Sequence, residues 1–287
     1  MFRKYFFSFF IPFWLHGNAQ NLSVAVYKDE GVSDFSYALV EHSFKTLVPE
    51  STVTPIKALD IIENELRKKK FDLLVMPGGA DLFYAKKLKG KGNAKIREFV
   101  AKGGAYLGLC AGGYYGAKDV EFDKDGPLEV IAPRELAFFQ GWAVGPRYPY
   151  TCGQHTGARA EPIYFEDEKK DKKNQSSLTV YYNGGGTFYA QNNFSDYTII
   201  AQYQNQDPAI IYIAVGKGHV VLSGVHFEYC PDWMEKINKE PDSHLKGILE
   251  AIRSSNKERK KFFQRMIHLL VPSFANQEPT LGSLNAE

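Results

Sequence analysis

Short apolar runs alternate with amphipathic segments over the first 110 residues, and this alternation restricts the fold more than any other feature. The runs are apolar on both faces, as are strands of a parallel sheet that helices cover on both sides. The segments between them place apolar residues at helical spacing. The expected strands are residues 22–27, 51–56, 71–79 and 105–110, and the expected helices are residues 36–47, 58–70 and 93–104. The pattern therefore predicts an α/β fold with a mostly parallel sheet.

The chain changes character between about residues 120 and 225, where β-rich segments and loops replace the alternation. The sequence GKGH within this region is typical of a hairpin turn. Residues 243–270 then have the apolar spacing of one or two helices. We find no internal repeat and no composition break that marks a second domain. The expected organisation is an α/β domain with β-rich additions over residues 20–235, a helical extension over 236–272 and a loose tail over 273–287.

The first 19 residues have the layout of a secretory signal peptide. Arg3 and Lys4 precede an aromatic-rich apolar run over residues 5–15. This run is shorter than the about 20 residues that a helix needs to span a bilayer. Gly17 and Ala19 then form a small-x-small cleavage pattern. We expect cleavage after Ala19 and a secreted or periplasmic protein that has no membrane association once the signal is removed.

The charge of the chain argues against a nucleic acid partner. Removal of Arg3 and Lys4 with the signal peptide changes the formal net charge from +2 to 0. A neutral chain without a basic stripe offers no electrostatic attraction to a phosphate backbone. The lysine-rich segments 66–70 and 256–261 are typical of solvated helix faces.

Cys110 lies in the glycine-rich sequence GLCAGG, directly after the apolar run that begins at residue 105. This sequence matches the small-x-nucleophile-x-small elbow, in which glycines permit a tight turn from a strand into a helix. The N-terminus of the following helix favours a thiolate, which makes the cysteine a candidate nucleophile. The structural alternative is a small buried cysteine in a glycine-rich crossing of the core.

Backbone N–H groups near Cys110 are candidate donors to an oxyanion. Ala111 and Gly112 follow the cysteine at the start of the expected helix, where N–H groups lack helical partners. Gly78 and Gly79 end another expected strand, in the sequence MPGGAD. Because functional groups gather beyond the carboxyl ends of parallel strands, we expect the two glycine-rich turns to lie close together.

A histidine and a carboxylate occur together late in the β-rich region. His226 and Glu228 lie two positions apart in the sequence GVHFE, so their side chains share a face in an extended chain. A carboxylate in this position can orient an imidazole, and a cysteine with an oriented histidine is a common arrangement for nucleophilic catalysis. A surface histidine on an edge strand beside a solvated glutamate is the structural alternative.

The other cysteines are Cys152 and Cys230. In an exported protein, an odd cysteine count suggests one disulfide and one free thiol, so Cys152–Cys230 is a candidate disulfide if Cys110 is the reactive residue. The spacing of these two cysteines with His155 and His226 matches no usual zinc site. We expect no metal.

The chain resembles the class I glutamine amidotransferase superfamily in the order of three motifs, PGG after a strand, GLCAGG and HFE. It is more closely similar to the N-terminal domain family of eukaryotic-type biotin–protein ligases, which also includes stand-alone bacterial proteins. The resemblance covers about residues 22 to 230 and is carried by MPGGADLFY, GNAKIREFVAKGGAYLGLCAGGYYG, RELAFFQGWAVGP and GKGHVVLSGVHFE. It implies a flavodoxin-like sheet, Cys110 as nucleophile, His226 as base and Glu228 as its orienting carboxylate. It also implies an oxyanion hole at Gly79 and Ala111.

Two positions depart from the pattern of glutamine-using relatives. Tyr114 stands four residues after the nucleophile, where those relatives usually carry Gln, and Phe227 stands where Pro is usual. No Gly-Arg-Gly-Arg-type adenylate loop occurs, so we do not expect biotin ligation. The resemblance therefore implies an amidohydrolase that forms a thioester with a small-molecule or peptide amide, and that needs no cofactor or synthetase partner.

Two alternatives remain open at this point. The first is a non-catalytic module that keeps the fold and binds a ligand or partner, which Tyr114 and an oxidising compartment both favour. The second is an envelope protein whose aromatic-rich β region binds a partner.

Overall fold

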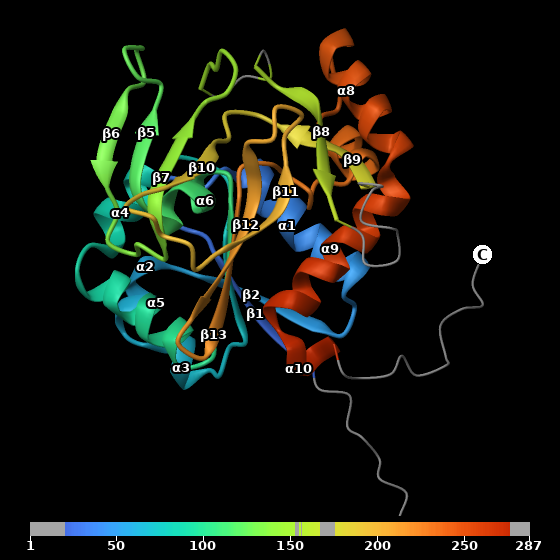
Figure 1. The fold of residues 1–287 in the computed structure, drawn as a ribbon. Coiled ribbons are helices and arrows are strands. Elements are labelled where there is room, and N and C mark those ends of the chain that lie inside the picture. The colour runs from blue at the N-terminus through green and yellow to red at the C-terminus, as the bar shows by residue number, and fades with distance from the viewer. Residues whose placement is uncertain (1–20, 153–154, 156, 167–175, 276–287) are drawn as a thin grey trace, which may run out of the picture.

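A central sheet runs through the protein in the order β2-β1-β3-β4-β13-β12-β11-β8-β9 (Figure 1). The protein is described by a computed structural model over residues 21–152, 155, 157–166 and 176–275. The strands of this sheet are β1 (Leu22–Tyr27), β2 (Ser51–Ile56), β3 (Leu73–Met76), β4 (Ala105–Leu109), β8 (Arg159–Phe165), β9 (Ser176–Tyr182), β11 (Thr198–Gln202), β12 (Pro208–Val215) and β13 (Gly218–Ser223). The predicted signal peptide, residues 1–19, lies outside the described residues, as do residues 276–287 of the expected tail.

The first part of the sheet is parallel, as the sequence predicts. Strands β2, β1, β3, β4 and β13 pair in parallel along this order. From β13 onward the pairing is antiparallel, through β12, β11, β8 and β9. The GKGH sequence forms the predicted turn between β12 and β13. The antiparallel strands extend one side of the parallel sheet.

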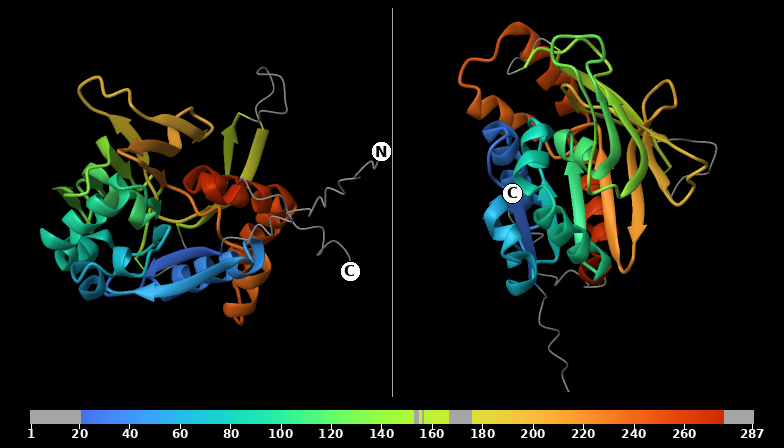
Figure 2. Two further views of the ribbon diagram at one scale, coloured as in Figure 1. Left: turned by 90° about the horizontal axis from the view of Figure 1, so that it is seen from below. Right: turned by 90° about the vertical axis from the view of Figure 1, so that its left-hand side faces the viewer.

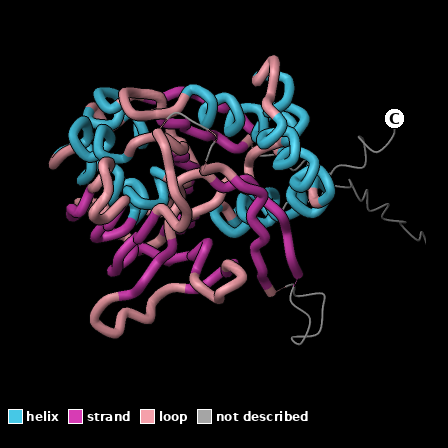
Figure 3. Tube along the Cα trace, turned by 90° about the horizontal axis from the view of Figure 1, so that it is seen from above, coloured by secondary structure: helices cyan, strands magenta, loops and turns pink. Residues whose placement is uncertain are grey.

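A second, smaller sheet has the order β10-β7-β5-β6. Its strands are β5 (Ala117–Phe122), β6 (Val130–Pro133), β7 (Phe139–Gly145) and β10 (Thr187–Ala190). Figure 3 shows strands and long loops that extend away from the region where the helices gather. The second sheet and the antiparallel part of the central sheet are the predicted β-rich additions.

Helices cover both faces of the central sheet (Figure 2). They are α1 (Asp34–Leu47), α2 (Ala58–Ile62), α3 (Glu65–Lys68), α4 (Asp81–Leu88), α5 (Lys91–Ala101), α6 (Ala111–Gly116), α7 (Pro231–Ile237), α8 (Ser243–Ser254), α9 (Asn256–Leu270) and α10 (Pro272–Ala275). Alternate residues of β1 face opposite cores: Val24 and Val26 pack with α1 and α9, whereas Ala25 and Tyr27 pack with α2, α4 and α5. The strand is therefore apolar throughout because both of its faces are covered. No helix in the described ranges is long and apolar enough to cross a membrane.

The predicted helix over residues 58–70 is wrong in its continuity and in its buried face. It is broken into α2 and α3 at Asn64, whose φ of 70° is left-handed, and asparagine tolerates this conformation better than most residues. Leu59 of α2 is 63% exposed, so the helical spacing of apolar residues over 58–70 does not identify the buried face. Residues 243–270 form two helices that meet at Ser255.

Helix α9 belongs to the same hydrophobic core as the parallel part of the sheet. Phe263 of α9 is fully buried and packs edge-on against Phe44 of α1, with ring centroids 5.3 Å apart. It also contacts Phe227, with centroids 6.1 Å apart, in the segment that follows β13. The helix therefore supports the chain between β13 and α7.

Removal of the Phe263 ring should strongly destabilise the protein. The Phe263→Ala variant leaves a cavity between α1, α9 and the segment after β13, and we expect a loss of about 3–5 kcal/mol in the free energy of unfolding. Urea denaturation measures this loss. The matched control is Leu59→Ala, at an exposed helical position, which should change stability by no more than about 0.5 kcal/mol. Similar small losses in both variants would contradict the placement of α9 in the core.

Candidate active site

Cys110 occupies the bend between β4 and α6. It is the N-cap residue of α6 and has φ 51° and ψ −105°, a strained conformation for a residue other than glycine. The next turn of chain lies directly against two neighbouring strands. A Cβ atom on Gly112 would lie 2.0 Å from the Met76 carbonyl oxygen at the end of β3, and one on Gly113 would lie 2.6 Å from that of Ser223 at the end of β13. Only glycine allows this approach.

His226 and Glu228 lie in the segment that leaves β13, and their side chains are in contact. His226 Nδ1 is 2.7 Å from Glu228 Oε1, and the two residues are 3% and 0% exposed. The ring of His226 stacks on Tyr229 with centroids 4.1 Å apart, and its backbone N–H donates to the Tyr181 carbonyl. The imidazole is therefore fixed in place from several sides.

Cys110 is a second hydrogen-bonding partner of this imidazole. Burial lowers the pKa of His226, but the Glu228 carboxylate and a hydrogen bond to Cys110 outweigh it and raise the pKa to about 10. Because Nδ1 faces Glu228, Nε2 is the ring nitrogen left for the Cys110 sulfur. A protonated imidazole in this position can stabilise a thiolate.

The two glycines of the MPGGAD turn have different surroundings. The Gly78 N–H donates to Ser36 Oγ at 2.8 Å, so it is already used within the protein. Gly78 also lies against the His226 ring, since a Cβ on this residue would be 2.9 Å from Cε1. Gly79 pairs with Val32 in an isolated bridge. Ala111 is the first residue of α6, so its N–H has no acceptor within the helix, whereas the Gly112 carbonyl accepts from the Tyr106 hydroxyl.

Three tyrosine hydroxyls hold a glycine turn over Cys110. Tyr114, Tyr182 and Tyr203 donate to the carbonyls of Gly184, Gly185 and Gly186, at 3.2, 2.7 and 2.8 Å. The preceding carbonyl, of Asn183, lies 3.7 Å from the Cys110 sulfur. We call residues 183–186 the glycine turn. Tyr114, which stands where glutamine-using relatives usually carry Gln, is therefore a buried support of this turn.

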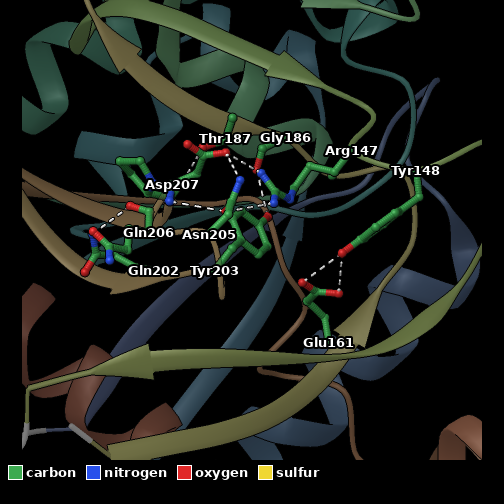
Figure 4. Close-up of polar contacts among 12 residues, drawn as sticks. Arg147, Tyr148, Glu161, Gly186, Thr187, Gln202, Tyr203, Asn205, Gln206 and Asp207 are labelled. Atoms are coloured by element: carbon green, nitrogen blue, oxygen red, sulfur yellow. Dashed lines mark hydrogen bonds and ion pairs between the residues drawn. The ribbon is translucent and has the colours of Figure 1, made fainter.

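Figure 4 shows a polar network around Arg147, close to Gly186 of the glycine turn. Arg147 donates to Asp207 at 2.8 Å and to Asn205 at 3.0 Å, and its guanidinium lies 3.9 Å from the centre of the Tyr203 ring. The Arg147 backbone N–H donates to the Tyr182 hydroxyl at 2.7 Å. The network thus orients two of the tyrosines that hold the turn. Nothing in the sequence marks these long-range contacts in advance.

Access to the thiol is narrow. Cys110 is 8% exposed. Tyr150 lies beside Gly184, where a Cβ atom would be 2.7 Å from its ring. Phe122 contacts both Tyr150 and Tyr114 edge-on, with centroids 5.6 and 5.7 Å apart. Burial raises the pKa of Tyr114 and of Tyr150, and the nearby Cys110 thiol raises it further, so this aromatic cluster lies close to the sulfur.

The candidate Cys152–Cys230 disulfide is not formed. All three cysteines are free thiols. Cys152 is exposed. Burial, the Cys110 thiol and Cys152 together raise the pKa of Tyr150 to about 12, so Cys152 lies close to Tyr150. Cys230 is buried at the start of α7, where it lines a cavity with His42 and Arg259. The two residues therefore belong to different surroundings.

The fold identifies the class of protein, and the sequence then gives the family. The fold is that of class I glutamine amidotransferase-like proteins: a solved glutamine amidotransferase from Thermotoga maritima covers 90% of this chain and 100% of its own, with a TM-score of 0.53 and 14% identity. A family profile described as biotin-protein ligase, N terminal, matches residues 22–284, and the chain belongs to this family.

Two relatives differ in how much of their length the chain spans. A biotin–protein ligase of Schizosaccharomyces pombe is 36% identical over 242 residues, which is 80% of this chain but 37% of the ligase. An uncharacterized protein of Chlamydia muridarum is 31% identical over 258 residues, which is 86% of this chain and 95% of that protein. The family predicted from the sequence and the predicted α/β fold with a mostly parallel sheet are thus confirmed.

Loss of the Tyr203 hydroxyl should destabilise the protein. Tyr203→Phe leaves the buried Gly186 carbonyl without its partner, so we expect the free energy of unfolding to fall by about 1–3 kcal/mol in urea denaturation. Tyr197→Phe is the matched control, because no hydrogen bond of the Tyr197 hydroxyl is found among the described residues. An unchanged stability of Tyr203→Phe would show that water replaces this hydroxyl at no cost.

Proposed function

We propose that the protein is a cysteine-dependent amidohydrolase that acts on a small-molecule or peptide amide. The observation that carries this proposal is the contact of three side chains from two distant parts of the chain: Cys110 on its strained bend, and the His226–Glu228 pair after β13. A cysteine thiol suits the role of nucleophile, an imidazole can carry the proton, and a carboxylate can orient the imidazole. The contacts run from Cys110 to His226 to Glu228, as these roles require.

The proposed reaction begins with attack of the Cys110 sulfur on the amide carbon. The carbonyl oxygen becomes an oxyanion, which the N–H groups of Gly79 and Ala111 would stabilise. Protonated His226 then gives its proton to the leaving amine as the C–N bond breaks, and a thioester remains on Cys110. His226, now neutral, accepts a proton from water, whose oxygen attacks the thioester. Breakage of the C–S bond releases the carboxylic acid, and Glu228 orients the imidazole throughout.

The surroundings of the thiol suggest a slender substrate. Only 8% of Cys110 is exposed, and the aromatic cluster of Tyr114, Phe122 and Tyr150 lies beside it. Tyr114 takes the position of the usual Gln, so a preference for glutamine does not follow from the fold. The whole-protein activity of the fission yeast ligase is not part of the proposal, because the matched region is 37% of that protein.

A non-catalytic binding module is the second candidate function. The observation that favours it is the same low exposure of Cys110, because a thiol that meets no substrate needs no opening. The two functions differ in the expected reactivity of Cys110.

The rate of Cys110 alkylation tests the proposal. Iodoacetamide at neutral pH should modify Cys110 at least about tenfold faster in the natural protein than in His226→Ala, because the histidine promotes the thiolate. Peptide mass spectrometry separates the three cysteines, and exposed Cys152 is an internal control that should react equally in both proteins. Equal rates at Cys110 would favour the binding module. A screen of glutamine, peptides and cell-wall fragments, with Cys110→Ala as the inactive control, then identifies the amide.

We further propose that the protein is exported, because residues 1–19 have the layout of a signal peptide. The mature protein should begin at Gln20, which N-terminal sequencing of the protein from the culture medium or periplasm determines. Recovery of the protein from the cytoplasm with Met1 intact would contradict export without affecting the proposed chemistry.

A further inference from the structure

A second candidate site lies beside the segment that carries His226 and Glu228, where Arg259 donates to the Phe227 carbonyl. A cavity of about 340 Å³ is lined by residues of α1, α7 and α9, including His42, Trp233 and Arg259. Cys230, just before α7, also lines it. None of Cys110, His226 and Glu228 is among its lining residues, so it is separate from the proposed active site. In Figure 1, α1 and α9 lie close together on one side of the central sheet.

Arg259 brings a buried positive charge to this cavity. The residue is 1% exposed, and its guanidinium donates to Asn256 Oδ1 at 2.9 Å and to the Phe227 carbonyl at 3.1 Å. Both acceptors are neutral, and among the described residues no carboxylate forms a direct ion pair with Arg259. Burial accordingly lowers its pKa, although Cys230, Glu228 and Asp232 partly oppose this. A buried charge that has no direct ion pair is costly, so the site favours an anion.

Two of the other three charged lining residues are also cations. Lys236 and Lys260 line it and are exposed. The acidic lining residue, Asp232, is engaged by Arg253, whose Nε lies 3.0 Å from its carboxylate. The cavity thus has three cations and one carboxylate that is already paired.

An aromatic pair forms another part of the wall. The rings of His42 and Trp233 stack with centroids 4.5 Å apart and an interplanar angle of 2°. The Lys236 ammonium lies 4.9 Å from the centre of the Trp233 ring. Burial lowers the pKa of His42, and Arg259 and Lys236 lower it further, so at neutral pH this ring is an uncharged surface beside the cations.

We propose that this cavity binds a doubly charged, phosphate-type oxyanion, with Arg259 as the buried counter-charge and with Lys236 and Lys260 at the opening. A guanidinium matches the geometry of such oxyanions, and three cations favour a dianion over a monocarboxylate. The ligand is either free phosphate or the phosphoryl group of an organic phosphomonoester whose organic part lies along the His42–Trp233 pair.

Phosphate titration of the full chain tests this site. Inorganic phosphate should raise the melting temperature saturably, whereas acetate at equal ionic strength should not. The Lys236→Gln/Lys260→Gln double variant should bind phosphate at least about tenfold more weakly, because it loses two favourable charge interactions. Lys246→Gln/Lys257→Gln is the matched control, with the same charge change on α8 and α9 but outside the cavity. Equal weakening in both double variants, or equal stabilisation by acetate, would overturn the proposal.

Cys230 provides a second measurement that does not depend on melting. Saturating phosphate should slow the alkylation of Cys230, which lines the cavity, and leave that of exposed Cys152 unchanged. Unchanged labelling of Cys230 would place any bound phosphate elsewhere and overturn the site. Phenyl phosphate distinguishes the ligand sources: tighter binding than inorganic phosphate supports a phosphomonoester, and equal binding supports free phosphate.

Discussion

The site depends on a contact between backbones at the carboxyl end of the parallel sheet. Strand β4 lies between β3 and β13, and α6 begins directly over the ends of these two neighbours. Gly112 lies against the Met76 carbonyl and Gly113 against that of Ser223, at separations that leave no room for a side chain. This contact fixes the bend at Cys110 and brings the chain after β3 and after β13 to the same place. A larger residue at either glycine would lift α6 and separate the sulfur from the imidazole.

Much of the fold follows from patterns that are local in the sequence. Strand β1 is apolar throughout because its alternate residues enter two cores, and such a run can be recognised without a structure. The elbow at Cys110 and the close pair of His226 and Glu228 are likewise local motifs. Their meeting follows from the parallel sheet order and from the family resemblance, not from either motif alone.

Other features depend on contacts that no local pattern reveals. The helix breaks at Asn64 because this residue adopts a left-handed backbone conformation, which the spacing of apolar residues does not reveal. Leu59, on the N-terminal side of the break, is exposed. The tyrosines that hold the glycine turn come from α6, β9 and the end of β11, so their common role appears only when these elements are assembled. The candidate Cys152–Cys230 disulfide is not formed in the structure, and cysteine count and compartment say nothing about where these two residues lie.

The position of β2 at the border of the central sheet has a consequence for self-association. An outermost strand with free backbone donors is a template for addition of a strand from another molecule, which leads to aggregation. Pro55 lies within β2, in register with Val26, and its ring nitrogen has no hydrogen to offer. The row of backbone N–H donors along this edge strand is therefore interrupted at Pro55. The interruption disfavours edge-to-edge pairing of two molecules at high concentration.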